Sequence, residues 1–479
     1  MSFSDNKVFT ASLWSTLSEI VAKIISPVVF LILTRLLSPS DFGVVAVATT
    51  LMTFMMIVSD LGTAKFIIQK EDSDDLTFNI LASNCFWINA IIGLLIFMVI
   101  FISSNKLAVM FNEPKSIMVI KVMAFQVIFN SLSSLHNALK KKSLDFKFLF
   151  YTRLITIGCP LFLAVPIAFL GGGYWAIVIA NLVGSFLNFL VLWLFSSFRP
   201  IWNIDFKTIK GILDASIWNT IEEVFIWLPI FLDTYLISNY ISSSELGLFT
   251  SSRTVYLTLS TLLLSPLLPV LYSAFVKVSK TGAYKEKILS AHHIIFSIAM
   301  LSSSLGFVFS DFIENVVFDD KWVGIGEILK FTFILMGATY FNEVIIQGLR
   351  AKGYFKAIGL NVLICTLITI PFIVYSIKYG ILVYVVVRYS SLYLRFFYIF
   401  YKSRKVLNIS FLNCFKQSKN ILIISLFLIF FSVIIDSYTS LSYFFILMLK
   451  IIMSMVFIGV FLFYDKRILF LIKSKIFNR

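Results

Sequence analysis

Apolar runs of about twenty residues recur from one end of this chain to the other, and each is long enough to cross roughly 30 Å of hydrocarbon. Backbone N–H and C=O groups in lipid must be satisfied within each segment, so runs of this kind form helices. Barrel strands would be shorter and would alternate apolar and polar residues. Only 14% of the 479 residues are charged, against about a quarter in soluble domains. The sequence therefore predicts an all-α, polytopic membrane protein.

About fourteen transmembrane helices are expected. The predicted spans are residues 8–36, 42–62, 77–103, 116–139, 148–170, 173–196, 212–238, 246–275, 288–309, 325–348, 357–377, 381–401, 419–436 and 443–463. The first is too long for a signal-peptide core, and Pro266 and Pro269 interrupt the eighth. The connections, at most about twenty residues long, leave no room for a soluble catalytic domain. The chain is not expected to be an enzyme.

Lysines and arginines gather in alternate connections. If the N-terminus is cytoplasmic, the outer connections hold only Arg35, Lys106, Lys115, Lys321 and Lys378, and the other loop cations lie inside. Membrane proteins show this bias toward positive inner loops. Both termini are therefore predicted to be cytoplasmic. The net charge of +15 then faces an anionic inner leaflet, so membrane lipids and not nucleic acids are the expected partners.

The residue types that bind metals and cofactors form no pattern here. Cys85, Cys159, Cys365 and Cys414 are scattered, and the chain has three histidines. These spacings match neither a metal site nor a disulfide framework. The glycines at 171–173 are expected to form a tight turn, because a phosphate-binding loop would need a lysine and a preceding strand. No metal and no cofactor are predicted.

Two segments of the chain repeat at one offset. Residues 11–21 (ASLWSTLSEIV) align with residues 215–225 (ASIWNTIEEVF), and residues 37–43 (LSPSDFG) align with residues 241–247 (ISSSELG), in both cases 204 positions apart. Six predicted spans separate the copies, so both copies enter the membrane in the same direction. Parallel repeats of this kind are related by an axis along the membrane normal in some transporters.

The repeat predicts two six-helix lobes around a central cavity that opens to alternate sides of the membrane. The expected parts are a first lobe (1–205), a second lobe (206–408), and an appended pair of helices with a basic cytoplasmic tail (409–479).

Several ionisable residues lie inside predicted spans, where charge is costly and is commonly functional. Lys23, Arg153, Arg253 and Arg388 are candidates for substrate binding in the cavity; Glu19, Glu222, Glu223 and Asp233 are candidates for ion coupling or charge balance. A structural reading stays open, because Glu19 and Lys23 are four residues apart and could pair on one helix face. A lumen containing cations suits an anionic, hydrated cargo, since arginine binds phosphate oxygens in pairs.

Three early segments resemble one group of transporters. Residues 34–44 (TRLLSPSDFGV), 59–62 (SDLG) and 66–70 (FIIQK) are similar to the opening of polysaccharide or O-antigen flippases, and residues 246–253 (LGLFTSSR) resemble their eighth helix. These flippases belong to the multidrug/oligosaccharidyl-lipid/polysaccharide exporter superfamily. The similarity is to the colanic-acid or teichuronic-acid exporter type.

The resemblance implies a flippase that moves undecaprenyl-pyrophosphate-linked oligosaccharides across the bacterial inner membrane for surface polysaccharide assembly. Lys23 and Arg253 would hold the diphosphate or acidic sugars, while Glu19 and Glu223 would balance charge or exchange protons or sodium. The polymerase and chain-length regulator of the same pathway are possible partners. Two alternatives remain open: a cation-coupled multidrug exporter of the superfamily, and a peptidoglycan-precursor (lipid II) flippase.

Overall fold

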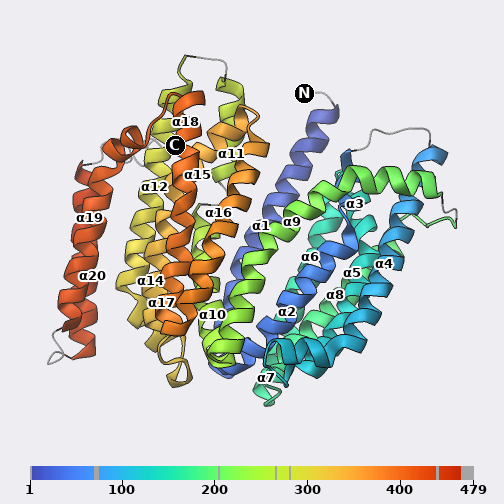
Figure 1. The fold of residues 1–479 in the computed structure, drawn as a ribbon, viewed down its shortest axis with the longest axis horizontal. Coiled ribbons are helices and arrows are strands. Elements are labelled where there is room, and N and C mark those ends of the chain that lie inside the picture. Colours follow the sequence, from blue (N-terminus) through green and yellow to red (C-terminus); the bar gives the residue numbers. More distant parts are fainter. Residues whose placement is uncertain are drawn as a thin grey trace. The chain divides into compact units, whose positions relative to one another are not determined.

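The computed structural model describes residues 3–69, 75–202, 205–264, 267–279, 282–437 and 442–464. All regular structure in these ranges is helical (Figure 1). Twelve helical segments there are long and apolar enough to cross a membrane. The predicted all-α membrane fold is therefore confirmed.

The chain divides into two compact units, Met1–Thr250 and Ser251–Arg479. The first holds α1 (Phe3–Leu36), α2 (Pro39–Asp60), α3 (Thr63–Gln69), α4 (Asp75–Met110), α5 (Ser116–Lys142), α6 (Phe146–Cys159), a π-helical turn (Pro160–Ala164), α7 (Val165–Phe169), α8 (Trp175–Phe195), α9 (Phe206–Tyr240) and the start of α10 (Ser243–Leu263). This unit boundary does not test the lobe boundaries predicted at residues 205 and 408.

The second unit contains the rest of α10 and the remaining helices. These are α11 (Leu267–Val278), α12 (Tyr284–Val308), α13 (Ser310–Phe312), α14 (Ile325–Ala338), α15 (Tyr340–Ala351), α16 (Phe355–Ser376), α17 (Ile381–Ser390), α18 (Leu394–Val406), α19 (Phe411–Ser437) and α20 (Tyr443–Tyr464). A π turn (Ile313–Val317) and 3-10 turns (Asp320–Trp322, Ile377–Tyr379, Ser391–Tyr393) join some of them.

Twelve of the fourteen predicted spans coincide with the membrane-length helices. The other two, 212–238 and 246–275, fall on α9 and on α10 with α11. Neither α9 nor α10 is among the twelve membrane-length helices. The count of fourteen is therefore approximate.

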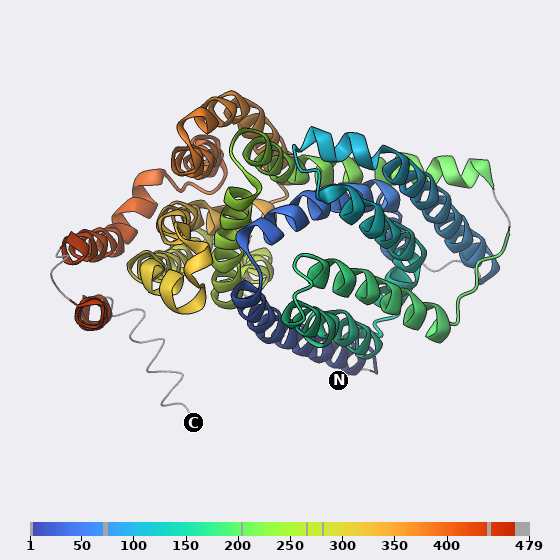
Figure 2. The same ribbon diagram turned by 90° about the horizontal axis from the view of Figure 1, so that it is seen from below.

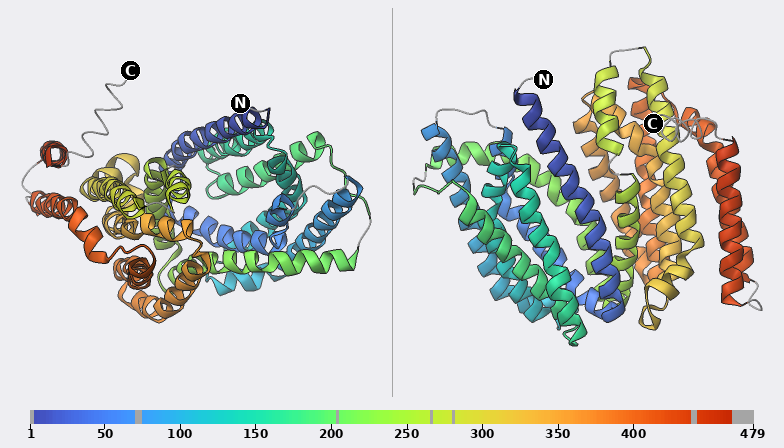
Figure 3. Two further views of the ribbon diagram at one scale, coloured as in Figure 1. Left: turned by 90° about the horizontal axis from the view of Figure 1, so that it is seen from above. Right: turned by 180° about the vertical axis from the view of Figure 1, so that it is seen from behind.

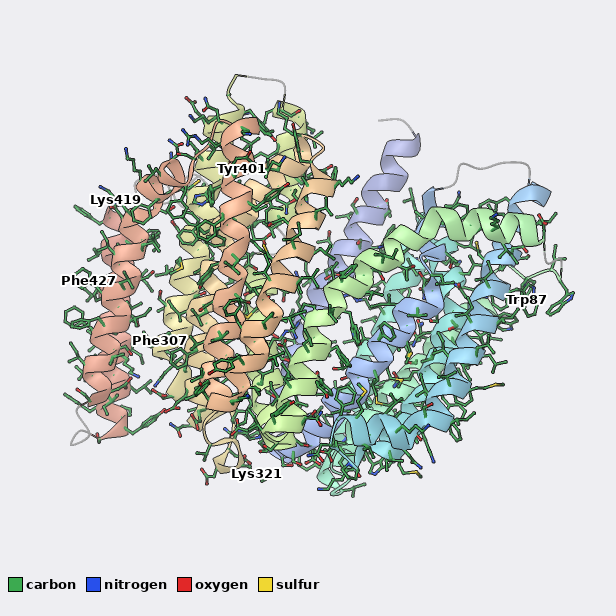
Figure 4. All side chains as sticks on the ribbon, viewed as in Figure 1. Trp87, Phe307, Lys321, Tyr401, Lys419 and Phe427 are labelled. Atoms are coloured by element: carbon green, nitrogen blue, oxygen red, sulfur yellow. The ribbon has the colours of Figure 1, made fainter. Side chains whose placement is uncertain are left out.

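Large apolar side chains cover the outer faces of many helices. Ile102, Phe162 and Leu426 are 80%, 75% and 64% exposed, and Figure 4 shows Phe427 pointing away from its helix, α19. Contiguous apolar surface on this scale is unfavourable in water and is expected against lipid. The inward faces pack into apolar clusters, one of them around Phe341 in the second unit.

The N-terminal turns of α2 and α10 approach closely at two glycines. A Cβ on Gly43 would overlap the carbonyl oxygen of Ser243, and a Cβ on Gly247 would overlap that of Pro39. The offset of 204 places Pro39 on Ser243 and Gly43 on Gly247. The contact is thus reciprocal, as a two-fold relation between the repeated segments requires.

The appended helices α19 and α20 pack against each other, and α19 packs against α12; Figure 3 shows α19 and α20 in two views. Lys450 of α20 is 4% exposed. Its Nζ lies 2.7 Å from Asp436 Oδ1 on α19 and 3.5 Å from Asp311 Oδ2 on α13. Lys330 of α14 also pairs with Asp311, at 2.7 Å. This four-residue charge network joins the last helices to the rest of the second unit.

Candidate functional site

The first unit encloses a polar cavity of about 420 Å³. Helices α1, α5, α6 and α8 line it, and Figure 2 views the helices of the first unit from below. Its lining residues are Ser15, Ser18, Glu19, Asn137, Lys141, Phe146, Leu149, Phe150, Thr152, Arg153, Thr156 and Asn188. Two of the predicted site residues, Glu19 and Arg153, are therefore part of one cavity.

Local interactions fix the residue at which α6 begins, and this sets the position of Arg153 along the helix. Asp145 caps the helix, because its Oδ1 accepts the Phe148 N–H at 3.3 Å. Such a cap satisfies a backbone donor that the first turn leaves unpaired. Lys140 fixes the cap through an ion pair of 2.9 Å with Asp145 Oδ2. Arg153 then lies about two turns into α6, facing α1.

An ion pair in the lining of the cavity joins α1 to α6. Arg153 Nη1 donates to Glu19 Oε1 at 2.5 Å and to Ser18 Oγ at 3.4 Å. Glu19 thus pairs with Arg153 on a neighbouring helix. The two side chains are 50% and 40% exposed, so both charges remain accessible from the cavity.

The cavity combines charge with many hydrogen-bonding groups. Lys141 and Arg153 supply two cations against the one carboxylate of Glu19. Asn137, Asn188 and several hydroxyl groups supply neutral donors and acceptors. An arginine and a lysine suit phosphate or carboxylate oxygens, while amides and hydroxyls suit sugar hydroxyls. The arrangement is thus chemically suited to an anionic, hydroxyl-rich molecule.

The other predicted residues of the first unit lie outside this lining. Glu223 on α9 pairs with Lys65 on α3, at 2.6 Å between Nζ and Oε1. Asp233 is 2% exposed within α9, and Lys23 is half-buried on α1. Each of these residues interacts with other groups. The side chain of Glu222 lies outside the described part of the chain.

Arg253 on α10 and Arg388 on α17 belong to the second unit. Both are half-buried, and Arg388 interacts with other groups.

Sequence reasoning missed the other ten lining residues, among them the polar Asn137, Lys141 and Asn188. Lys141 sits in the run Lys140–Lys142, which reads as loop charge at the inner surface. These lysines instead form the last turn of α5. Lys141 lines the cavity, whereas Lys140 pairs with Asp145. Helical spacing gives a usable signal, because Asn137 and Lys141 are four residues apart and share a face.

In the described ranges, no group of three His, Cys, Asp or Glu residues is placed so that it could hold a metal ion. The four cysteines are buried and unbridged. The predicted turn at residues 171–173 is present between α7 and α8. Gly171 and Gly173 adopt φ values of +81° and +52°, a region that favours glycine.

Comparison with known proteins places this chain in a family. The family model described as polysaccharide biosynthesis protein matches residues 32–327. The chain belongs to this family. The resemblance expected from the early segments is therefore confirmed.

Two relatives illustrate the similarity. The succinoglycan biosynthesis transport protein ExoT of Rhizobium meliloti is 22% identical over 55% of this chain and 52% of its own length. The lipopolysaccharide biosynthesis protein WzxC of Escherichia coli is 22% identical over 68% of this chain and 66% of its own length. The chain thus spans about half of the first relative and just under two thirds of the second.

Solved structures share the fold over more of the chain. The lipid II flippase MurJ in an inward closed conformation matches with a TM-score of 0.75, at 14% identity, over 96% of this chain and all of its own. An inward-facing multidrug resistance MATE family transporter of the MOP superfamily matches with a TM-score of 0.64, at 12% identity, over 82% of this chain and 99% of its own. The chain therefore shares the fold of these two solved proteins.

Proposed function

We propose that this protein is a flippase for undecaprenyl-pyrophosphate-linked oligosaccharides, which it moves from the cytoplasmic to the periplasmic leaflet of the bacterial inner membrane. Membership in the polysaccharide biosynthesis family carries the proposal. The two relatives are named for succinoglycan transport and lipopolysaccharide biosynthesis. Both termini are placed in the cytoplasm, on the distribution of loop cations.

The physical task is to carry a hydrated sugar and a diphosphate through hydrocarbon, where unpaired polar groups cost several kcal/mol each. The polar cavity of the first unit gives such a headgroup hydrogen-bonding partners in place of water, while the polyprenyl tail stays in lipid. Arg153 and Lys141 bind the diphosphate, and the amides and hydroxyls form hydrogen bonds with the sugars. The chain carries its cargo without chemical change, so it acts as a transporter and not as an enzyme.

Resetting the empty carrier requires a change in the charge of the cavity. Glu19 already balances Arg153 at 2.5 Å, so an incoming diphosphate competes with Glu19 for that arginine. Release of a proton or a sodium ion from Glu19 would restore the pair, and Glu222, Glu223 and Asp233 are the other candidates for ion coupling. Lys23, Arg253 and Arg388 remain candidate headgroup contacts, and the pathway's polymerase and chain-length regulator are candidate partners.

The test is deletion of the gene in its own host, with analysis of surface polymer and lipid-linked oligosaccharides. Lost polymer and complete repeat units accumulating on undecaprenyl pyrophosphate support the proposal. Unchanged glycolipids and polymer overturn it and favour a drug exporter. Accumulation of peptidoglycan precursor instead would assign the lipid II activity.

Complementation with point variants then tests the cavity. Arg153→Gln is expected to lower polymer export by about tenfold or more, because charge-assisted hydrogen bonds contribute strongly to anion binding. Lys106→Gln is the matched control, since Lys106 is an exposed cation on α4 outside the cavity lining. Equal export by the two variants, at equal protein levels in the membrane, would remove Arg153 from the cargo site.

A further inference from the structure

The second unit encloses a polar cavity of its own, of about 160 Å³. It lies among α15, α16, α18 and the turn that precedes α18. Its lining residues are Thr339, Asn342, Glu343, Ile346, Arg350, Ile358, Asn361, Val362, Leu392, Arg395 and Ile399. Three of these are charged, and none of the three belongs to the candidate site described above.

The linings of the two cavities correspond at an offset of 209, five more than the offset of 204 that relates the earlier repeated segments. Five lining positions of the first recur in the lining of the second, each 209 positions later: Asn137 and Ile346, Lys141 and Arg350, Leu149 and Ile358, Thr152 and Asn361, Arg153 and Val362. One of the five pairs is a cation in both cavities: Lys141 in the first and Arg350 in the second. The second cation and the carboxylate come from different helices in the two copies.

The charges of the second cavity lack direct partners. Within the described ranges, Glu343, Arg350 and Arg395 have no ion pair, although both arginines act on the Glu343 carboxylate through space. In the first cavity, by contrast, Arg153 is held by Glu19. Two arginines and one carboxylate leave one net positive charge inside apolar spans, where unmatched charge is costly.

A buried neutral group also lacks a partner in this cavity. Asn342 is 4% exposed, and its Oδ1 has no hydrogen-bond partner among the described residues. A buried amide oxygen left unsatisfied costs about 1–3 kcal/mol. Asn361 on the facing helix is already engaged, because its Oδ1 accepts from Cys365 Sγ at 3.2 Å. Since an amide can be turned over without changing its shape, Asn342 can offer either an acceptor or a donor to a bound molecule.

We propose that this cavity binds a phosphoryl group, either of a phospholipid headgroup or of a soluble phosphate or diphosphate. The guanidinium groups of Arg350 and Arg395 present forked donors that match phosphate oxygens. The volume of 160 Å³ is about ten times the roughly 15 Å³ that one water molecule needs. Asn342 completes the polar wall. Glu343 offsets part of the positive charge of the two arginines while no ligand is bound. This site is independent of the proposed transport activity.

The experiment uses the purified full-length protein in neutral detergent, titrated with sodium pyrophosphate at constant ionic strength. The readout is the unfolding midpoint of each variant relative to its own ligand-free midpoint. Arg350→Gln and Arg395→Gln are expected to weaken the stabilising effect by about tenfold or more in ligand concentration. Lys356→Gln, an exposed cation at the start of α16, is the control. Repeating the series with Arg153→Gln removes any contribution from the first cavity.

Glu343→Gln separates a binding role from a structural one. Loss of the carboxylate removes repulsion toward an anion, so pyrophosphate should stabilise this variant at lower concentration than the natural chain. A residue needed only for packing would not strengthen binding when it is replaced.

A second arm identifies the source of the phosphoryl group. The protein is reconstituted in phosphatidylcholine discs with and without phosphatidylglycerol, and retained lipid is measured by native mass spectrometry. Retention of phosphatidylglycerol that falls in both arginine variants assigns a lipid headgroup, whereas an effect of pyrophosphate alone assigns a soluble ligand. Indistinguishable behaviour of both arginine variants and Lys356→Gln in both arms overturns the proposal.

Discussion

Glu113 is a buried carboxylate in the connection between α4 and α5. It is 6% exposed, and Ser243 at the start of α10 donates its hydroxyl to it. Burial raises the pKa of Glu113 above its usual value near 4.5, although the Lys115 backbone N–H partly offsets this. A carboxyl group with a raised folded-state pKa stabilises the fold at low pH, and this contribution is lost as pH rises through the folded pKa.

Replacing Glu113 should therefore flatten part of the pH dependence of stability. We expect Glu113→Gln to remove the loss of stability predicted for the natural chain as the pH rises above about 4.5, because the amide keeps a hydrogen bond to Ser243 and cannot ionise. The measurement is the unfolding midpoint in one detergent across this range. Glu286→Gln, at an exposed position, should leave the profile unchanged. A profile of Glu113→Gln parallel to the natural one would contradict the assignment.

The buried Lys450 gives a second prediction at the residue scale. Its side chain is 5% exposed and lies between Asp436 and Asp311. Removing one partner of a fully buried ion pair costs about 3–5 kcal/mol. The cost here is expected to be smaller, because Asp436 and Asp311 are 29% and 33% exposed and Asp311 also pairs with Lys330. Lys450→Met should still lower the stability of the second unit, as measured by denaturant unfolding in mixed micelles.

Two further variants check this explanation. Adding Asp436→Asn to Lys450→Met should recover part of the loss, since the carboxylate left without its partner is then neutral. Lys330→Met should cost less, because Lys330 is 22% exposed. No recovery in the double variant would mean that Lys450 contributes by packing alone.

At the scale of elements, the close approach of α2 and α10 depends on two glycines. A Cβ at Gly43 or Gly247 would overlap a backbone carbonyl of the facing helix. Overpacking of this kind costs about 1–3 kcal/mol. Gly43→Ala and Gly247→Ala should each lower the unfolding midpoint by similar amounts, because the two contacts are equivalent.

The double variant should cost less than the sum of the two single ones, since the first alanine already separates the helices. Gly359→Ala on α16 is the control: nothing lies near its Cβ position, and alanine stabilises a helix interior by about 0.5–1 kcal/mol relative to glycine. A stabilising effect at Gly43 would show that the helices are not in contact there.

The existence and type of the helices follow from local sequence. Twelve of the fourteen predicted spans coincide with membrane-length helices, because lipid leaves the backbone no alternative to the helix. Most ends agree within a few residues, but the predicted ends at 103 and 419 lie seven and eight residues from Met110 and Phe411. The eighth predicted span is an exception, because it is divided into two helices near Pro266: α10 ends at Leu263 and α11 begins at Leu267. Helix spacing did not predict the ion pair that Glu19 makes with Arg153 on a neighbouring helix.

At the scale of the whole molecule, the sequence by itself determined the membrane class, the approximate helix count, the family and the duplicated segments. Each depends on short-range pattern or on similarity along the chain, which folding does not alter. Only the tertiary structure decided which charges share a cavity. Lys141 joins Glu19 and Arg153, while Glu223 pairs with Lys65. It also showed that Arg350 and Arg395 line a second cavity. These groupings depend on the rotation and packing of helices far apart in sequence, which local pattern does not encode.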